Sequence, residues 1–238
     1  MNIFAIGDIH GCLNQLISLH ENIFNYKEFK KEEDLIIYLG DYIDRGKESK
    51  QVISEIIDLR NKGFKTEYIK GNHDEMMIGF LFNKINNLEQ WLNFGADQTF
   101  RSYDIEIVDF IKDGFDDHVM DQLRKTLMEK LGINHINFFT NLKLKLSISQ
   151  YLFVHAGIDP KKKLEDQTKE DYLWSRSDDF FNKEFKTEKI IVHGHTPEKD
   201  IADLPGRINV DTGCYFSGKL SCVCLNDINS SRHFISNL

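Results

Sequence analysis

The sequence predicts an α/β (α+β) protein with two packed mixed β-sheets flanked by helices. Three observations lead to this prediction. Short apolar runs alternate with helical patterns over the first 70 residues, the middle of the chain is helical and polar, and the second half returns to short apolar runs. We therefore expect one domain over 1–238, built from two sheets or from one sheet folded over, with a helical cap inserted at about 76–141.

The first half alternates strands with helices. Apolar runs of strand length each end at a glycine, and helical spacing of apolar residues separates them. The expected strands are 2–6, 34–39 and 64–70, and the expected helices are 13–24 and 49–62. Gly63 is a predicted helix C-cap. This order of strand, helix and strand is typical of a mostly parallel or mixed sheet.

The middle and the second half differ in their patterns. Between the sheet halves, Trp91 and Phe94 are expected to anchor helices, and Gly95, Gly114 and Gly132 are expected to interrupt them. Alternation of apolar and polar residues over 142–149 predicts a half-exposed strand. Further strands are expected at 151–154, 189–192, 207–210 and 219–225.

Composition excludes several classes of protein. The chain has 41% hydrophobic and 29% charged residues, which is typical of a globular protein and not of a disordered chain, a collagen or a coiled coil. Its net charge of −8 makes it a poor candidate for binding nucleic-acid polymers. No apolar run approaches about 18 residues, so we expect no membrane span. Met1–Ile9 has no signal-peptide pattern and the four cysteines are scattered, so we expect reduced thiols and a cytoplasmic location.

Five segments combine an apolar strand-like run with potential metal ligands directly after it. They are GDIHG (7–11), GDYIDRG (40–46), GNHD (71–74), HAG (155–157) and HGHT (193–196). Taken singly, each could be a turn, a helix cap or a buried histidine. Five in one chain are hard to explain as separate accidents. Because open α/β sheets bind ligands at the carboxyl ends of their strands, we expect the five segments to meet.

The ligand types indicate the chemistry. The candidate ligands are Asp8, His10, Asp41, Asn72, His155 and His195. A mixed nitrogen and oxygen set without thiolate suits Mn, Fe or Zn. Six ligands exceed one tetrahedral centre but fit two metals that share a carboxylate, as in phosphoester hydrolases that use a dimetal-activated hydroxide. Arg45 and Arg176 can hold phosphoryl oxygens with bidentate hydrogen bonds.

This ordered motif set resembles the phosphoprotein phosphatase family of calcineurin-like metallophosphoesterases. The stretches LWSR (173–176) and DTGC (211–214) are similar to those of lambda-type serine/threonine protein phosphatases of phages and bacteria. The resemblance covers about residues 1–225, and covers the helical middle poorly. It implies that Asp8 and His10 bind one metal, that Asp41 bridges two, and that Asn72, His155 and His195 complete the second site.

The resemblance also implies roles beyond metal binding. His73 would be the general acid, Asp44 its carboxylate partner, and Arg45 and Arg176 would bind the phosphoryl group. His193 is expected to pack in a strand rather than to bind metal. Two divalent ions are expected, with Mn²⁺ first and Fe or Zn as alternatives. The other histidines match no motif and are expected at the surface: His20, His118, His135 and His233.

Three functions stay open. The first is a metal-dependent phosphomonoesterase of the serine/threonine protein phosphatase type, acting on phosphorylated proteins, with phosphotyrosine also open. The second is hydrolysis of dinucleoside polyphosphates such as diadenosine tetraphosphate, a nucleotide substrate. Symmetrical diadenosine tetraphosphatases usually carry Ala-Arg-Gly where this chain has 44–46, and Gly-His-Trp where it has 194–196. Both differences favour the first function. An inactive binding module is the third, and the complete ligand set disfavours it.

Overall fold

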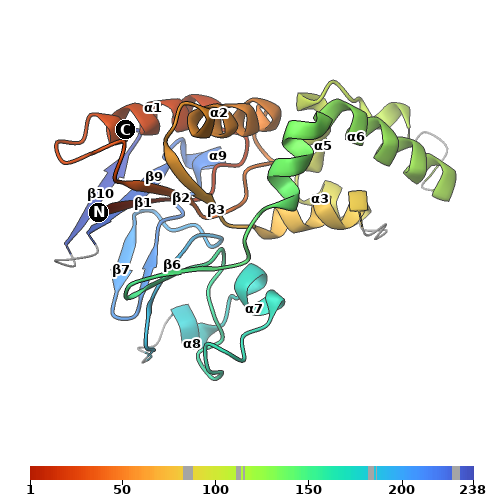
Figure 1. The fold of residues 1–238 in the computed structure, drawn as a ribbon. Coiled ribbons are helices and arrows are strands. Elements are labelled where there is room, and N and C mark those ends of the chain that lie inside the picture. The colour runs from red at the N-terminus through yellow and green to blue at the C-terminus, as the bar shows by residue number, and fades with distance from the viewer. Residues whose placement is uncertain (83–87, 111–113, 115, 182–184, 186, 227–230) are drawn as a thin grey trace.

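The computed structural model describes residues 1–82, 88–110, 114, 116–181, 185, 187–226 and 231–238. Over these residues the chain forms two five-stranded mixed sheets (Figure 1). The first has the order β10-β9-β1-β2-β3, and the second has the order β4-β5-β6-β8-β7. The predicted fold of two packed mixed sheets with flanking helices is confirmed.

The first sheet holds the N-terminal strands and both C-terminal strands. Its members are β1 (Asn2–Ile6), β2 (Leu35–Tyr38), β3 (Lys65–Tyr68), β9 (Ser221–Asn226) and β10 (Arg232–Ser236). Strands β1, β2 and β3 run parallel, while β9 lies antiparallel to both β1 and β10. The carboxyl ends of the three parallel strands therefore lie at one edge of the sheet, where the first three motifs begin.

The second sheet supplies the remaining motifs. It contains β4 (Leu146–Ile148), β5 (Tyr151–Phe153), β6 (Ile190–His193), β7 (Ala202–Leu204) and β8 (Arg207–Asn209). Strands β5, β6 and β8 are parallel, and antiparallel β4 and β7 form the edges. The HAG and HGHT motifs follow β5 and β6, again at carboxyl ends.

The sheets pack face to face, and helices cover their outer faces. Strand β1 is buried on both sides: Ile3 and Ala5 contact the core between the sheets, whereas Phe4 and Ile6 contact the outer helical core. Helices α1 (Leu13–Phe24) and α2 (Ser49–Asn61) cover the first sheet, and α7 (Lys169–Trp174) and α8 (Asp178–Phe181) cover the second (Figure 1). A short helix, α9 (Cys214–Ser217), precedes β9. None of the described helices is long and apolar enough to span a bilayer.

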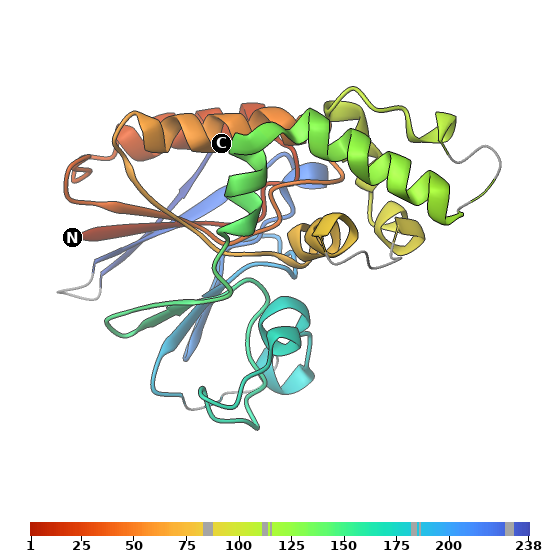
Figure 2. The same cartoon turned by 45° about the vertical axis from the view of Figure 1, so that its right-hand side comes forward.

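A helical segment follows β3. It comprises α3 (Asn72–Phe82), α4 (Leu88–Asn93), α5 (Ala96–Ser102), the 3₁₀ turn η1 (Ile107–Asp109) and α6 (Asp117–Thr140). Helices α5 and α6 contact α2, so the segment extends the outer core of the first sheet sideways (Figures 1 and 2). Gly95 begins α5 with φ 94°, and Gly132 interrupts α6 with φ 66°, as expected from the sequence. Because α3 starts at Asn72, its first turn belongs to the GNHD motif and not to a separate cap.

Two local expectations differ from the structure. The predicted strand 142–149 is divided between the sheets: Lys143 exchanges backbone hydrogen bonds with Tyr68 and Lys70 beside β3, and only 146–148 joins the second sheet. His20 is buried and not at the surface, because its Nε2 lies 2.9 Å from the Tyr38 hydroxyl. His135 is half-buried, while His118 and His233 are exposed.

Candidate metal centre

The five motifs meet where the carboxyl ends of the two sheets face each other. Asp8, Asp41 and Asn72 follow β1, β2 and β3 of the first sheet, and His155 and His195 follow β5 and β6 of the second. These residues and His10 are each at most 5% exposed. Six side chains that lie far apart in the sequence therefore converge on one buried region, as predicted from their positions at strand ends.

Two groups of side chains could each hold a cation, and they share Asp41. One consists of His10, Asp41 and His73, the other of Asp41, His155 and His195, with ligand atoms in each group within 4.8 Å of one another. Asp41 Oδ2 lies 3.4 Å from Nε2 of both His10 and His155. A carboxylate between two histidine groups is the arrangement that a bridging ligand needs.

Asn72 completes the second group. Its Oδ1 lies 2.8 Å from His155 Nε2 and 2.9 Å from His195 Nδ1, and these two nitrogens are 3.2 Å apart. Ligand atoms bound about 2.1 Å from one cation lie about 3.0–3.4 Å from each other in octahedral or tetrahedral geometry. The separations in this group are thus close to those of a metal coordination shell.

Asp8 lies beside the second group rather than within either group of three. Its two carboxylate oxygens accept hydrogen bonds from the backbone N–H of His195 at 3.2 and 3.0 Å. Gly194 makes this approach possible, because a Cβ atom there would lie 2.1 Å from Asp8 Oδ1. Gly71 has the same relation to Asp41, where a Cβ would lie 2.0 Å from Oδ1. The motif glycines therefore leave room for the carboxylates.

Hydrogen bonds to backbone carbonyls orient two of the histidine rings. His10 Nδ1 donates to the carbonyl of Ile43 at 2.7 Å, and His155 Nδ1 donates to that of Leu39 at 2.9 Å. A carbonyl only accepts, so in the neutral ring the other nitrogen, Nε2, carries the lone pair. Both Nε2 atoms face Asp41, and such second bonds are typical of histidines that bind metals.

Several buried carboxyl groups lie close together in this region, and their mutual repulsion would be relieved by bound cations. Burial raises the pKa of Asp8 well above its usual range, and burial with a nearby Asp41 raises the pKa of Asp74 to about 7 and that of Asp211 to about 6. Burial also opposes ionisation of Asp41, but His155 and His73 hold its pKa well below the usual range. Against the penalty of burial, Asp41 and Asp8 raise the pKa of His155 to about 10. The donor set fits divalent cations.

His73 and Asp44 form a pair next to this centre. His73 Nδ1 donates to Asp44 Oδ2 at 2.6 Å, and His73 Nε2 lies 3.9 Å from Asp41 Oδ2. The guanidinium of Arg45 donates to the same Nε2 at 3.1 Å, and exposed Arg176 donates through Nε to His195 Nε2 at 3.0 Å. The two predicted phosphate-binding arginines therefore approach the centre from different loops.

Backbone strain concentrates in the same loops. Of the seven described non-glycine residues with positive φ, five belong to the motifs: His10, Asp41, Asp44, Arg45 and His195, with φ between 46° and 70°. The left-handed region costs about 1–2 kcal/mol per residue for such side chains. Strain of this kind persists only where the surroundings hold it, and it is typical of functional sites.

Sequence reasoning missed four side chains that support the site. Asp74 Oδ2 accepts from the N–H groups of Asp41 and Gly71 at 3.0 and 2.8 Å, and buried Asp211 lies near Asp8. Asp74 lies in the GNHD motif and Asp211 in the DTGC stretch, so their positions in the sequence could have indicated that they support the site. Trp91 and Thr99 hydrogen-bond to Asp44, but no motif surrounds them. His193, expected to be a packing residue, is buried and packs against Phe180 with ring centroids 5.0 Å apart and ring planes tilted by 59°.

Aromatic side chains line the edge of the centre, and we call them the aromatic rim: Phe94, Trp174, Tyr215 and Phe216. The ring centroid of Phe94 lies 5.7 Å from that of His73, that of Trp174 lies 6.1 Å from that of His195, and that of Tyr215 lies 5.5 Å from that of His10. Phe216 packs against Tyr215, with ring centroids 4.9 Å apart. Trp174 is 37%, Tyr215 43% and Phe216 63% exposed. The guanidinium of Arg45 lies 4.6 Å from the ring centroid of Tyr215, and the rim thus places exposed aromatic surface beside the metal ligands.

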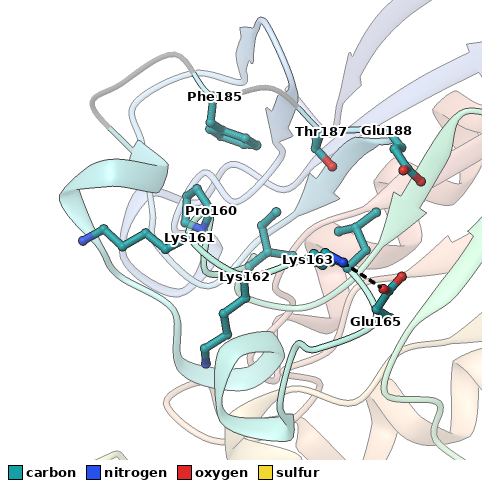
Figure 3. A pocket seen from close by; sticks show the side chains of 10 residues that line it. Pro160, Lys161, Lys162, Lys163, Glu165, Phe185, Thr187 and Glu188 are labelled. Atoms are coloured by element: carbon teal, nitrogen blue, oxygen red, sulfur yellow. Dashed lines mark ion pairs between the residues drawn. The ribbon is translucent and has the colours of Figure 1, made fainter.

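A separate surface pocket of about 630 Å³ lies in the second half of the chain, around Lys161, Lys162 and Lys163 (Figure 3). No predicted site residue lines it. Each lysine is paired with a nearby carboxylate, as Lys163 is with Glu165 at 3.8 Å. Because these charges are already compensated, the pocket offers little attraction for an anionic ligand.

Comparisons with known proteins agree with this geometry. A family model described as calcineurin-like phosphoesterase matches residues 1–225. The bis(5'-nucleosyl)-tetraphosphatase PrpE [asymmetrical] of Anoxybacillus flavithermus is 26% identical over 92% of this chain and 88% of its own length. The protein of the same name from Bacillus thuringiensis subsp. konkukian is 26% identical over 93% and 89%.

Solved structures share the fold at low sequence identity. A putative diadenosine tetraphosphatase superposes with a TM-score of 0.63 at 16% identity, covering 99% of this chain and 93% of that one. A protein serine/threonine phosphatase from Saccharomyces cerevisiae has a TM-score of 0.55 at 14% identity, covering 99% and 79%. Both similarities concern the fold alone.

Proposed function

The chain belongs to the calcineurin-like phosphoesterase family, and from this premise we propose that it hydrolyses phosphate esters at a centre of two divalent metal ions. The observation that carries the proposal is the pair of ligand groups that share Asp41 beside the His73–Asp44 pair. We propose one domain over 1–238, with a helical cap at about 76–141. The family assignment covers the phosphoesterase fold, and the substrate and the metals are part of what we propose.

Each predicted ligand has a place in this scheme. Asp8 and His10 would hold one ion, Asp41 would bridge, and the second ion would be held by Asn72, His155 and His195. When bound, the metals supply a hydroxide nucleophile and Lewis acidity toward a phosphoryl oxygen. Mn²⁺ is the first candidate, and Fe or Zn are the alternatives for this nitrogen and oxygen set.

His73 would deliver the proton to the leaving oxygen. Its Nδ1–H donates to Asp44 Oδ2 at 2.6 Å, so the proton available for transfer would be the one on Nε2. This nitrogen faces the shared Asp41. With Nε2 protonated, Arg45 can no longer donate to it, and the guanidinium is free to bind phosphoryl oxygens. Arg176 would bind them from the opposite loop, with the geometry that suits a guanidinium.

We propose phosphomonoesters of serine or threonine in proteins as the first substrate class. Asp44-Arg45-Gly46 and Gly194-His195-Thr196, which differ from the usual motifs of symmetrical diadenosine tetraphosphatases, support it. Dinucleoside polyphosphates are the second candidate, and two observations favour them. Curated relatives are named bis(5'-nucleosyl)-tetraphosphatases, and the aromatic rim places exposed rings beside the centre, where nucleobases could stack.

The test compares kcat/KM for three substrates with Mn²⁺-loaded protein: a phosphoserine peptide, a phosphotyrosine peptide and diadenosine tetraphosphate. We expect p-nitrophenyl phosphate to be hydrolysed as well, and chelation to abolish this activity. Metal-independent turnover would refute the proposed centre. A kcat/KM for diadenosine tetraphosphate well above that for both peptides would replace the first substrate class by the second.

A further inference from the structure

Three elements of the structure converge on Asp44, which has no exposed surface. Its Oδ2 accepts from His73 Nδ1 at 2.6 Å and from the Trp91 indole Nε1 at 2.7 Å, while its Oδ1 accepts from the Thr99 hydroxyl at 2.6 Å. Trp91 lies in α4 and Thr99 in α5. Two of the three donors to this carboxylate therefore come from α4 and α5, outside the motifs that carry the predicted ligands.

The helical segment also holds the backbone around Asp44. The Asp44 N–H donates to Thr99 Oγ1 at 2.9 Å and approaches Ser49 Oγ at 3.2 Å. The next N–H, of Arg45, donates to the carbonyl of Gly95 at 3.1 Å. Asp44 and Arg45 are consecutive left-handed residues with φ 70° and 67°. Bonds to Thr99 in α5 and to Gly95 just before it thus hold a backbone conformation that most side chains avoid.

We propose that Trp91 and Thr99 are positioning residues, which fix the Asp44 carboxylate and through it direct His73 Nε2 toward the leaving oxygen. The inference rests on the proposed role of His73 as general acid. An ionised carboxylate can accept about four hydrogen bonds, and three donors from different directions fix its plane. Once that plane is fixed, the ring of His73 has one orientation in which Nδ1 donates at 2.6 Å. The helical segment therefore has a role in the chemistry without touching the substrate.

Packing fixes the orientation of the Trp91 indole that donates to Asp44. The indole is fully buried, and its ring centroid lies 5.2 Å from that of Phe100 and 5.9 Å from that of Phe80. A buried indole N–H without an acceptor would be costly, so Trp91 and Asp44 satisfy each other. This arrangement provides a matched pair of variants. Trp91→Phe removes the donor and some ring volume, whereas Phe100→Leu removes ring volume in the same cluster and leaves the donor in place.

The experiment measures how strongly turnover depends on the leaving group. General acid catalysis matters for phenyl phosphate, whose leaving group is poor, and much less for p-nitrophenyl phosphate. Because a positioned general acid contributes about 10²–10⁴-fold, we expect Thr99→Val and Trp91→Phe to lower kcat for phenyl phosphate about tenfold more than for p-nitrophenyl phosphate. Metal content should stay at the parent value. Thr99→Ser, which keeps the hydroxyl, should restore the parent ratio, and Phe100→Leu should not change it.

A merely structural role would give a different result. If Thr99→Val and Trp91→Phe lowered both activities in the same proportion, or if Thr99→Ser behaved as Thr99→Val, the proposal would be wrong. A second measurement does not depend on turnover. The Trp91 indole proton, assigned by its loss in Trp91→Phe, should resonate downfield and exchange slowly, and should move upfield in Asp44→Asn.

The two measurements separate this inference from the proposed function. An unmoved indole resonance in Asp44→Asn would overturn the positioning role whatever the enzyme hydrolyses. Absence of turnover on both phenyl phosphates, with the resonance shifted as expected, would instead show that the proposed phosphoesterase activity is wrong while the hydrogen bonds to Asp44 are present.

Discussion

Gly194→Ala should remove metal from the centre without a change in any ligand residue. In the structure a Cβ atom at 194 would lie 2.1 Å from Asp8 Oδ1 and 3.2 Å from its Cγ. A carbon and an oxygen that are not bonded need at least about 3 Å, so the carboxylate must move by about an ångström. Metal sites tolerate deviations of only about 0.2 Å in ligand distance.

Asp8 has little room in which to adapt. It is 3% exposed, and both of its oxygens already accept from the His195 N–H, so displacement also breaks these bonds. We expect bound Mn²⁺ to fall from about two ions to about one per chain after gel filtration. We expect kcat for p-nitrophenyl phosphate to fall at least about 100-fold, the size of effect known for misplacement by an ångström. Elemental analysis and steady-state kinetics measure the two quantities.

Gly63→Ala is the matched control. Gly63 follows Lys62, the C-cap residue of α2, with φ 88° and open space around it, so alanine strains the backbone there and meets no neighbour. We expect it to lower the free energy of unfolding by about 1 kcal/mol while metal content and kcat stay at the parent values. If Gly194→Ala kept two ions and the parent kcat, the assignment of Asp8 as a metal ligand would be refuted.

Further substitutions test the other parts of the site. His73→Asn should lower kcat by about 10²–10⁴-fold with metal retained, and loss of metal would instead make His73 a ligand, as its position in one ligand group allows. Arg176→Ala should weaken inhibition by inorganic phosphate and lower kcat/KM without changing stability, since Arg176 is exposed, and an unchanged kcat/KM would assign its role to another cation. Glu75 pairs with Lys70 and Lys169 at 2.9 and 2.6 Å; burial opposes its ionisation, but the two lysines lower its pKa below the ordinary 4.5. A lowered pKa stabilises the fold above pH 4.5 and this contribution is lost as pH falls through the lowered value, so Glu75→Gln should cost about 1 kcal/mol at pH 7 and nothing at low pH in denaturant titrations.

Much of the fold and most of the site could be predicted from short stretches of sequence. Asp8, Asp41 and Asn72 each follow an apolar run that ends in glycine, and parallel strands bring such ends together at one edge. The helix over 13–24 was predicted with the bounds that the structure has. These features depend on local spacing and residue type, which the sequence states directly.

Other features depend on packing between distant segments. The run 142–149 alternates as one strand would, yet the chain passes from the first sheet to the second within it. Lys143 forms backbone hydrogen bonds with Tyr68 and Lys70 beside β3, whereas 146–148 pairs with β5. His20 matches no motif, and contacts with the Tyr38 hydroxyl, Glu55 and the Phe24 ring account for its place in the interior. A local pattern records how polar a segment is but not which partner covers it.

The sequence by itself determined which side chains are candidates for binding metal, and that they stand at the ends of strands. Only the tertiary structure decided that Asp41 faces histidines from both sheets, and that Asp44 receives hydrogen bonds from Trp91 and Thr99. The reason is physical. Strand ends follow from interactions along the chain, whereas a hydrogen bond between residues about fifty positions apart exists only once the helices and sheets between them have packed.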